Sequence, residues 1–306
     1  MRIYLTGADG MLGTALTAAL GADPATAHWA VKGVSVRDFD IADESAARAS
    51  ILGFAPDVVV HTAAHAIVDD CERDPSMALR VNIQGTHHVA DACREAGSQL
   101  VHISSDYVFD GATPPRGGYR EDAVPNPLSV YGLTKLAGER IAQSVPEHLC
   151  VRTSWLFGGA DERTDQVRSL VGALLRRERP ALIHDQFSCP TYTADLAGAL
   201  VRLLSGPLPP SGALHMANSG SASWQEVGLV AAAELRRAGL PDIPDPVPLS
   251  MEDCGFVGGR PRDSSLATGR LAGLGSPLPH WSDAVRRYCA ALLAEGSVAV
   301  GSPAAR

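Results

Sequence analysis

The sequence predicts a doubly wound α/β fold, in which helices cover both faces of a parallel sheet. Short apolar runs alternate with helical stretches through the first half of the chain, as in strands joined by crossover helices. The runs are almost continuously apolar, which is typical of strands buried on both faces. A glycine-rich turn follows the first run directly. In such a fold, ligands bind at the carboxyl ends of the strands.

Individual elements are predicted from local patterns. The predicted strands are apolar runs, namely Ile3–Leu5, Val34–Val36, Val58–Val60 and Leu100–Ile103. The predicted helices lie between these runs, at Met11–Ala19, Ser45–Ile51 and Met77–Ala96.

The apolar pattern loosens in the second half of the chain. Two further strands, Val151–Thr153 and Ala181–Ile183, are expected to return to the sheet. Pro207–Pro210 and Pro241–Pro248 predict connectors. Polar, proline-bearing stretches between these elements indicate a smaller C-terminal lobe that caps the substrate.

The predicted domain organisation follows from this change in pattern. Residues 1–155 are expected to form the nucleotide-binding domain. Residues 156–295 are expected to form the substrate lobe, with strands that return to the sheet. Residues 296–306 are expected to be a disordered tail.

Composition excludes several classes of partner. The chain has 26 basic and 34 acidic side chains and a net charge of −8, so no basic excess is available for nucleic acid or an anionic membrane. It has no run of about 18 apolar residues, and its N-terminus lacks the pattern of a signal peptide. The six cysteines are far apart, and no cluster has metal-ligand spacing. We therefore expect a cytoplasmic monomer or homodimer that binds a small molecule and has no catalytic metal.

A glycine motif, T-G-A-D-G-M-L-G at Thr6–Gly13, lies between the first strand and the first helix. Glycine permits a tight turn and a close approach of the backbone, and the helix N-terminus offers free N–H groups to a pyrophosphate. This placement predicts dinucleotide binding. Arg37 and Asp38 follow the second predicted strand, where the adenosine ribose is read. An acidic residue there favours NAD and an arginine favours NADP, so the choice of cofactor stays open.

Tyr131 and Lys135 stand four residues apart, which places them on one face of a helix. A free phenol has a pKa near 10, and a nearby ammonium favours the phenolate and lowers that pKa. Lys135 is one of only two lysines in the chain, and arginine would be too basic for this role. The pair predicts a proton relay.

Ser104–Tyr107 end the predicted strand that begins at Leu100. Because ligands bind at the carboxyl ends of strands, the hydroxyl of Ser105 is expected to bind the substrate oxygen together with Tyr131.

These motifs, in this order, resemble the dTDP-4-dehydrorhamnose reductase family, the sugar-nucleotide 4-ketoreductases of the extended short-chain dehydrogenases. The resemblance reaches to about residue 290. It is carried by Val60–Ala64, Val68–Asp69, Val81–Asn82, Ser105–Gly111, Tyr131–Glu139, Arg152–Gly158, Asp185–Gln186, Pro190–Thr191, Ser223–Trp224 and Arg260–Pro261.

The resemblance implies an NAD(P)-binding Rossmann domain and an NADPH-dependent reduction in deoxysugar biosynthesis, with NADH as a possible cofactor. Ser105, Tyr131 and Lys135 would be catalytic, with Tyr131 as the proton donor and Lys135 also at the nicotinamide ribose. The implied cofactor-binding residues are Gly7, Asp9, Gly10, Met11, Leu12, Arg37, Asp40, Ile41, Ala63, Ala64, Ser104, Tyr131 and Lys135.

The same resemblance implies the substrate site. Asp106, Tyr107 and Trp155 would line the sugar pocket, and Arg260 could reach the phosphates of the nucleotide. Ser105 stands where the family usually has threonine, which keeps the hydroxyl group.

Two other functions remain open at this point. A sugar-nucleotide epimerase or dehydratase would use the same fold and the same Tyr–Lys pair. However, such dehydratases typically have glutamate after the aspartate, where this chain has Tyr107. The family also resembles a regulatory subunit of methionine adenosyltransferase, which need not turn over a sugar. The residues do not name the deoxysugar.

Overall fold

The computed structural model of the protein describes residues 1–296. Its centre is a six-stranded, fully parallel sheet in the order β2-β1-β3-β4-β5-β9. The strands are β1 (Arg2–Thr6), β2 (Ala30–Val34), β3 (Val58–His61), β4 (Gln99–Ser105), β5 (His148–Thr153) and β9 (Gly212–His215). This architecture confirms the predicted doubly wound α/β fold.

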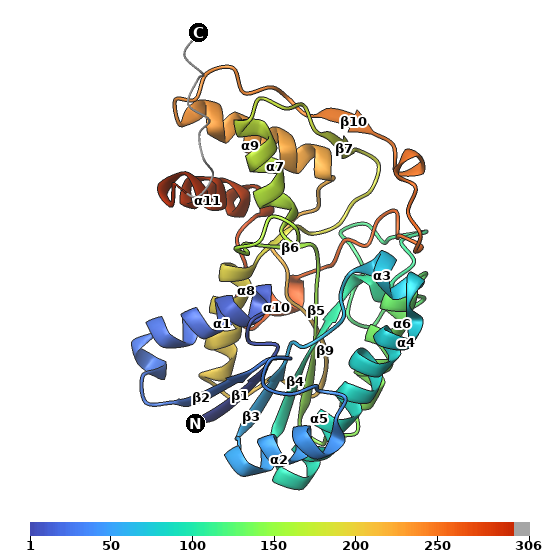
Figure 1. Cartoon of the computed structure of the whole chain (residues 1–306), viewed down its shortest axis with the longest axis vertical. Helices are drawn as coiled ribbons and strands as arrows, with labels where there is room; N and C mark the ends of the chain where they lie inside the picture. The colour runs from blue at the N-terminus through green and yellow to red at the C-terminus, as the bar shows by residue number, and fades with distance from the viewer. Residues whose placement is uncertain (297–306) are drawn as a thin grey trace.

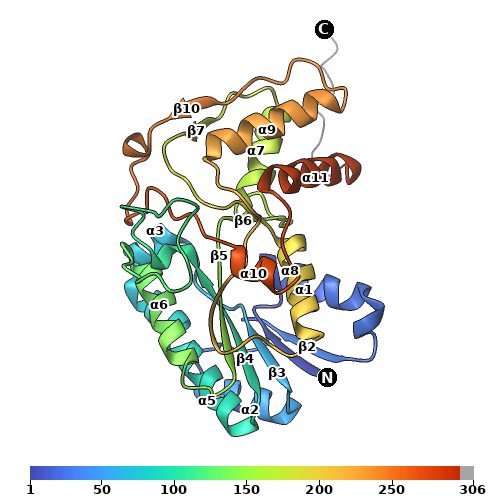
Figure 2. The same ribbon diagram turned by 180° about the vertical axis from the view of Figure 1, so that it is seen from behind.

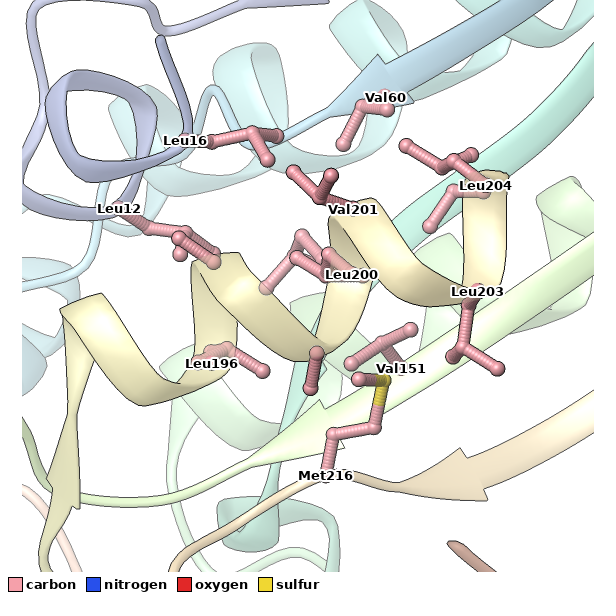
Figure 3. Close-up of a cluster of buried hydrophobic side chains, with 14 of the residues drawn as sticks. Leu12, Leu16, Val60, Val151, Leu196, Leu200, Val201, Leu203, Leu204 and Met216 are labelled. Atoms are coloured by element: carbon pink, nitrogen blue, oxygen red, sulfur yellow. The ribbon is translucent and has the colours of Figure 1, made fainter. Parts of the chain in front are cut away.

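Helices cover both faces of this sheet (Figure 1). On one face lie α1 (Met11–Ala22), α8 (Thr193–Leu204) and the short α10 (Gly269–Gly273). On the other face lie α2 (Glu44–Phe54), α5 (Thr86–Ala96) and α6 (Val130–Ala142). Figure 3 shows leucines of α1 and α8 meeting Val60 of β3 and Val151 of β5 in the larger core. Two buried layers of apolar side chains therefore hold the strands in place.

A smaller lobe lies beyond the carboxyl ends of the strands (Figures 1 and 2). Its core packs α7 (Gln166–Leu175), α9 (Trp224–Arg237) and α11 (Trp281–Ala294) around Phe157. Two small parallel sheets accompany these helices. They pair β6 (Leu156–Phe157) with β8 (Thr191–Tyr192), and β7 (Ala181–Ile183) with β10 (Val247–Leu249).

The remaining elements are short. They are η1 (Pro24–Thr26), α3 (Val68–Arg73), α4 (Pro75–Leu79), the π-helical segment η2 (Arg80–Gly85), η3 (Asp106–Val108) and η4 (Met251–Cys254).

Polar caps explain where several helices begin. The carboxylate of Asp43 accepts from the backbone N–H of Ala46 at the start of α2, and the hydroxyl of Ser129 accepts from Gly132 N–H at the start of α6. Each cap satisfies an N–H group that has no partner within the helix. The cap at Ser129 matters most for function, because it fixes the turn that carries Tyr131.

Two sequence predictions about strands are wrong. Ala181–Ile183 is a strand, but it pairs with β10 in a separate small sheet and does not return to the central sheet. The strand that does return is β9, whose few apolar residues gave no clear signal. The second predicted strand is also misplaced, because β2 ends at Val34. β2 lies at the edge of the sheet and buries only Val34. Its other residues show no apolar run, and the apolar run Val34–Val36 therefore predicted a strand too far along the chain.

Two other boundaries differ from those predicted. The helix expected at Met77–Ala96 is divided by the π-helical segment η2. Pro241–Pro248, expected to be a connector, contains the start of β10. Both α8 and β9 fall within residues 156–295 and complete the central α/β unit. The predicted tail, apart from Gly296, lies outside the described residues.

Candidate active site

The glycine turn after β1 leaves no room for side chains. Gly7 has a φ of +65°, and a Cβ there would lie 2.8 Å from both the backbone nitrogen of Ala63 and Oγ1 of Thr62. At Gly13 a Cβ would lie 2.1 Å from the carbonyl oxygen of Gly7. Gly10 occupies the N-cap of α1, where no side chain caps the helix. The first N–H groups of α1 are therefore available to a phosphate.

A cavity of about 330 Å³ opens beside this turn. Its volume lies within the range of small-molecule sites. Seven residues predicted to bind the cofactor line it, namely Gly7, Asp9, Gly10, Asp40, Ile41, Ala63 and Ala64. The cavity wall also contains residues that sequence reasoning missed, including Phe39, Thr62 and Arg80. Thr62 belongs to the Val60–Ala64 stretch that carries the family resemblance, whereas no motif marked Phe39 or Arg80.

The charged residues near the ribose end of the cavity have distinct partners. The side chain of Arg37 is 85% exposed, and its Nε lies 3.7 Å from Oδ2 of Asp9. The carboxylate of Asp38 accepts from the backbone N–H of Ser35 at 2.8 Å, so it stabilises the local turn. Arg80 lines the cavity and is ion-paired with Asp40. The end of the cavity thus carries a cation, Arg80, that the sequence did not single out.

Six predicted cofactor residues are not among those that line the cavity, namely Met11, Leu12, Arg37, Ser104, Tyr131 and Lys135. Leu12 is buried in the core beneath α1. Met11 lies against the backbone of Gly159. The hydroxyl of Ser104 donates to Oε1 of Glu139 at 2.6 Å. Only the backbone N–H groups of Met11 and Leu12, in the first turn of α1, remain suited to a phosphate.

Ser105 and Tyr131 come together where β4 ends and α6 begins. Ser105 is the last residue of β4, and Tyr131 is the second residue of α6. The Ser105 hydroxyl lies near the phenol of Tyr131, where it acts to lower the pKa of that phenol. Lys135 lies one turn further along α6 and is buried. The fold therefore assembles the three predicted catalytic residues at the carboxyl edge of the sheet.

Burial decides the charges of this group. It raises the pKa of Tyr131 above its usual range, and the nearby Ser105 hydroxyl opposes this only in part. Burial also lowers the pKa of Lys135 to about 8, against the opposing effect of Glu139. The net shift of the Tyr131 pKa is therefore upward, opposite to the lowering predicted from the Tyr–Lys spacing. Near pH 7, Tyr131 is a neutral phenol beside a mostly protonated lysine.

Asn82 connects α6 to the wall of the cavity. Its side-chain oxygen accepts from the backbone N–H of His65 at 2.7 Å, and its amide donates to Oγ1 of Thr134 at 2.9 Å. His65 follows Ala64, which lines the cavity, and Thr134 precedes Lys135. The π-helical segment η2 carries Asn82 inward, so this irregular turn helps to hold the Tyr–Lys helix next to the cavity.

Asp106, predicted to line the sugar pocket, is instead 1% exposed. Ser105 donates to its Oδ1 at 2.9 Å. Three more serine hydroxyls donate to Oδ2, from Ser154 at 3.1 Å, Ser188 at 2.8 Å and Ser264 at 2.6 Å. Burial raises the pKa of Asp106, while the four hydroxyls oppose this effect. Its side chain thus ties four segments together behind Ser105.

Tyr107 borders the phenol of Tyr131. The two ring centroids are 5.8 Å apart, and the ring planes are inclined by 70°. Gln186 lies near the hydroxyl of Tyr107 and acts to lower its pKa, while the Gln186 amide donates to the backbone oxygen of Pro261 at 3.0 Å. The sequence prediction left Gln186 without a role.

Arg260 and Trp155 come from the two ends of the lobe. Nη2 of Arg260 lies 3.0 Å from Oδ1 of Asp69, and the guanidinium stacks 4.4 Å above the ring of Phe256. Asp69 therefore holds the arginine that was predicted to reach the nucleotide phosphates. Trp155 has a φ of +40° and stacks on Trp224, a second residue absent from the predicted set.

Comparison with known proteins identifies the family. The family model described as "RmlD substrate binding domain" matches residues 1–294. The dTDP-4-dehydrorhamnose reductase of Streptomyces griseus is 35% identical over 310 residues, covering 99% of this chain and 97% of that protein.

This chain belongs to the dTDP-4-dehydrorhamnose reductase family. Another relative, the dTDP-4-keto-6-deoxy-D-glucose reductase of Streptomyces niveus, is 35% identical and covers 97% of this chain and 99% of that protein. Among solved structures, a dTDP-4-dehydrorhamnose reductase from Bacillus anthracis in complex with NADP superimposes with a TM-score of 0.84. It is 30% identical, and the match covers 94% of this chain and 98% of that one. The protein is thus an oxidoreductase of this family.

Metal-ligating clusters, membrane-spanning helices and disulfides are all absent from the described residues. Within residues 1–296, no group of three or more histidine, cysteine or carboxylate side chains could hold a metal ion. The same residues include no helix that is both long enough and apolar enough to cross a membrane. All six cysteines are free thiols.

Proposed function

We propose that the protein reduces the 4-keto group of a dTDP-4-keto-6-deoxyhexose to an alcohol, with NADPH as reductant, in cytoplasmic deoxysugar biosynthesis. The proximity of Ser105 and Tyr131 at the carboxyl edge of the sheet, the edge at which the glycine turn also lies, carries this proposal. A neutral phenol there could give a proton to a carbonyl oxygen. The names of the two Streptomyces relatives support the choice of substrate class.

The residues of the cavity fit a dinucleotide. A Cβ at Gly7 would collide with Ala63 and Thr62 of the cavity wall, and the uncapped start of α1 suits a pyrophosphate. Arg80 and Arg37 supply positive charge near the ribose end, which favours a 2′-phosphate. When bound, NADPH would supply the hydride for the carbonyl carbon.

The chain's own residues would handle the proton. As negative charge develops on the carbonyl oxygen, Tyr131 gives its phenolic proton to that oxygen. Its high pKa keeps the proton on the phenol until then. Ser105 lies near the phenol, and its own hydroxyl donates to Asp106. The positive charge of Lys135 stabilises the phenolate that forms.

Stoichiometry separates this proposal from the two alternatives. The purified protein is incubated with a panel of dTDP-4-keto-6-deoxyhexoses while NADPH absorbance and product stereochemistry are followed. We expect one NADPH consumed per alcohol formed. Turnover with only catalytic amounts of cofactor, giving an isomer or losing water, would identify an epimerase or dehydratase. No turnover across the panel, combined with a stable protein partner, would favour a regulatory subunit.

A further inference from the structure

A fully buried ion pair lies behind the Tyr–Lys helix. Nε and Nη2 of Arg152 lie 2.8 Å from the two carboxylate oxygens of Glu139, so the pair is bidentate. The side chains are 5% and 4% exposed. Ser104 adds a third donor, 2.6 Å from Oε1 of Glu139. All the strong donors of this carboxylate therefore come from the sheet, from β4 and β5.

The register of the sheet explains this convergence. Ser104 of β4 pairs with Arg152 of β5, so the two residues are direct neighbours in the parallel ladder. Both side chains meet Glu139 on the helix that packs on these strands. Arg152 is held further by a hydrogen bond of 3.3 Å to the carbonyl oxygen of Glu121, and it lies 5.1 Å from the centroid of the Phe109 ring. Its guanidinium is thus fixed before any ligand arrives.

Glu139 also stands one helical turn after Lys135. A lysine and a glutamate four residues apart on a helix normally attract each other and can form an ion pair. In this structure both oxygens of Glu139 are taken by Arg152 and Ser104. Other groups near Lys135 are His61 on β3, His102 on β4 and Cys150 on β5, besides Tyr131 on its own helix. None of these four is an anion near pH 7, so Glu139 is the carboxylate that could draw the lysine away.

We infer that Arg152 is a positioning residue that keeps Lys135 free to act on Tyr131 and the cofactor, by occupying Glu139. This inference rests on the proposed function. Arg152, Glu139 and protonated Lys135 together carry a net charge of +1. Because Arg152 and Glu139 neutralise each other, the remaining positive charge is that of Lys135. Without Arg152, Glu139 and Lys135 would form an ion pair along α6, and the ammonium of Lys135 would move toward Glu139 and away from Tyr131.

The test compares Arg152→Met, Arg152→Lys, Glu139→Gln and the double variant Glu139→Gln/Arg152→Met. The first variant leaves the carboxylate to Lys135, and the double variant removes the carboxylate as well. Because the chain has only two lysines, ¹³C-labelled lysine gives two side-chain signals, and Lys32→Arg assigns them. The midpoint of the Lys135 signal is followed from pH 6 to 11. This readout needs neither substrate nor cofactor, so it can fail or succeed independently of the proposed function.

We expect Arg152→Met to raise the midpoint of Lys135 by about one pH unit or more, a tenfold increase in proton affinity. NADPH binding and kcat should each fall about tenfold, with KM for dTDP-4-keto-6-deoxyglucose little changed. The double variant should recover most of both losses, because no carboxylate remains to capture the lysine. An unchanged midpoint in Arg152→Met, or a double variant no better than the single one, would overturn the inference.

Two variants keep the test decisive if Arg152→Met does not fold, since an unpaired buried carboxylate is strongly destabilising. Arg152→Lys keeps the charge but cannot bind both oxygens, so the midpoint of Lys135 should rise by a smaller amount. Glu139→Gln should lower that midpoint while NADPH affinity stays within about threefold of the unaltered protein. A midpoint unchanged in both variants would contradict the inference.

Discussion

The indole rings of Trp155 and Trp224 stack face to face, with centroids 4.5 Å apart and planes inclined by 10°. Trp155 follows β5 closely in a strained left-handed conformation, and Trp224 begins α9 of the lobe. The hydroxyl of Ser223 caps that helix and fixes where the second indole stands. The stack thus joins the lobe to the carboxyl edge of the sheet.

Replacing Trp224 should therefore weaken substrate binding more than chemistry. We expect Trp224→Ala to raise KM for the nucleotide sugar about tenfold, because Trp155 loses the ring that holds it in a strained conformation. An aromatic pair of this kind contributes about 0.5–1.5 kcal/mol beyond burial. Steady-state kinetics and the exciton couplet of the two indoles in circular dichroism check this. Trp224→Phe, which keeps an aromatic face, should behave nearly like the unaltered protein.

Removing the phenol of Tyr131 should damage catalysis while leaving cofactor binding intact. A positioned general acid contributes about 10²–10⁴ in rate, so Tyr131→Phe should lower kcat at least about a hundredfold. Ser105→Ala should be milder, since one lost hydrogen bond costs about 1–3 kcal/mol. Single-turnover reduction and NADPH titration measure both effects. Tyr4→Phe, which removes a phenol bonded to Ser50 elsewhere, is the control. Near-native rates in a folded Tyr131→Phe would assign the proton to another residue.

Cofactor affinity should decrease at alkaline pH. Burial lowers the pKa of Lys135 to about 8, so its positive charge is present below that pH and is lost above it. NADPH binding should be constant near pH 7 and weaken between pH 8 and 9.5, by at most about tenfold per pH unit. Fluorescence titration across this range tests the expectation. Lys135→Met should bind weakly at every pH, whereas Lys32→Met should keep the dependence; an identical slope in Lys135→Met would contradict it.

Preference for NADPH over NADH should depend on two arginines. Arg37 is exposed beside Asp9, and Arg80 lines the cavity. We expect Arg37→Ala and Arg80→Ala each to reduce the ratio of NADPH to NADH affinity, by up to about tenfold for one lost charge-assisted hydrogen bond. Isothermal titration with both cofactors measures that ratio. Arg73→Ala, an exposed arginine that pairs with Asp70, is the control. If neither variant changes the ratio, Arg37 and Arg80 do not bind the 2′-phosphate on the adenosine ribose of NADPH.

Acid should unfold the protein through three buried histidines. Burial lowers the pKa of His61 and of His215 to about 3, and that of His102 well below its usual value. These residues stay neutral in the folded chain but take up protons below about pH 6.5 once unfolded. Stability should therefore be full above pH 6.5 and fall by about 1.4 kcal/mol per pH unit for each histidine as the pH drops toward 3.

Urea denaturation at pH 7.5, 6.0 and 5.0 measures this loss. His215→Gln should remove about a third of the slope, whatever its effect on stability at neutral pH. His28→Gln, which changes an exposed histidine, should leave the slope as it is. A pH-independent free energy of unfolding would show that these three histidines do not control acid stability.

The sequence alone determined those features that depend on neighbouring residues in the chain. The turn at Gly7 requires glycine, because atoms of the loop that follows the neighbouring strand β3 leave no space for a Cβ. Tyr131 and Lys135 are brought to one helix face by their spacing alone. Buried parallel strands such as Val58–His61 are almost wholly apolar, so they could be found without any partner.

Only the tertiary structure decided which polar groups meet across long distances. The serines around Asp106 come from four segments, so no local pattern marks them. The register of β4 against β5 brings Ser104 and Arg152 together on Glu139. Burial then raises the pKa of Tyr131, whereas spacing alone suggested that Lys135 would lower it. Spacing along the chain fixes which residues share an element, but desolvation and hydrogen bonding depend on everything packed around them.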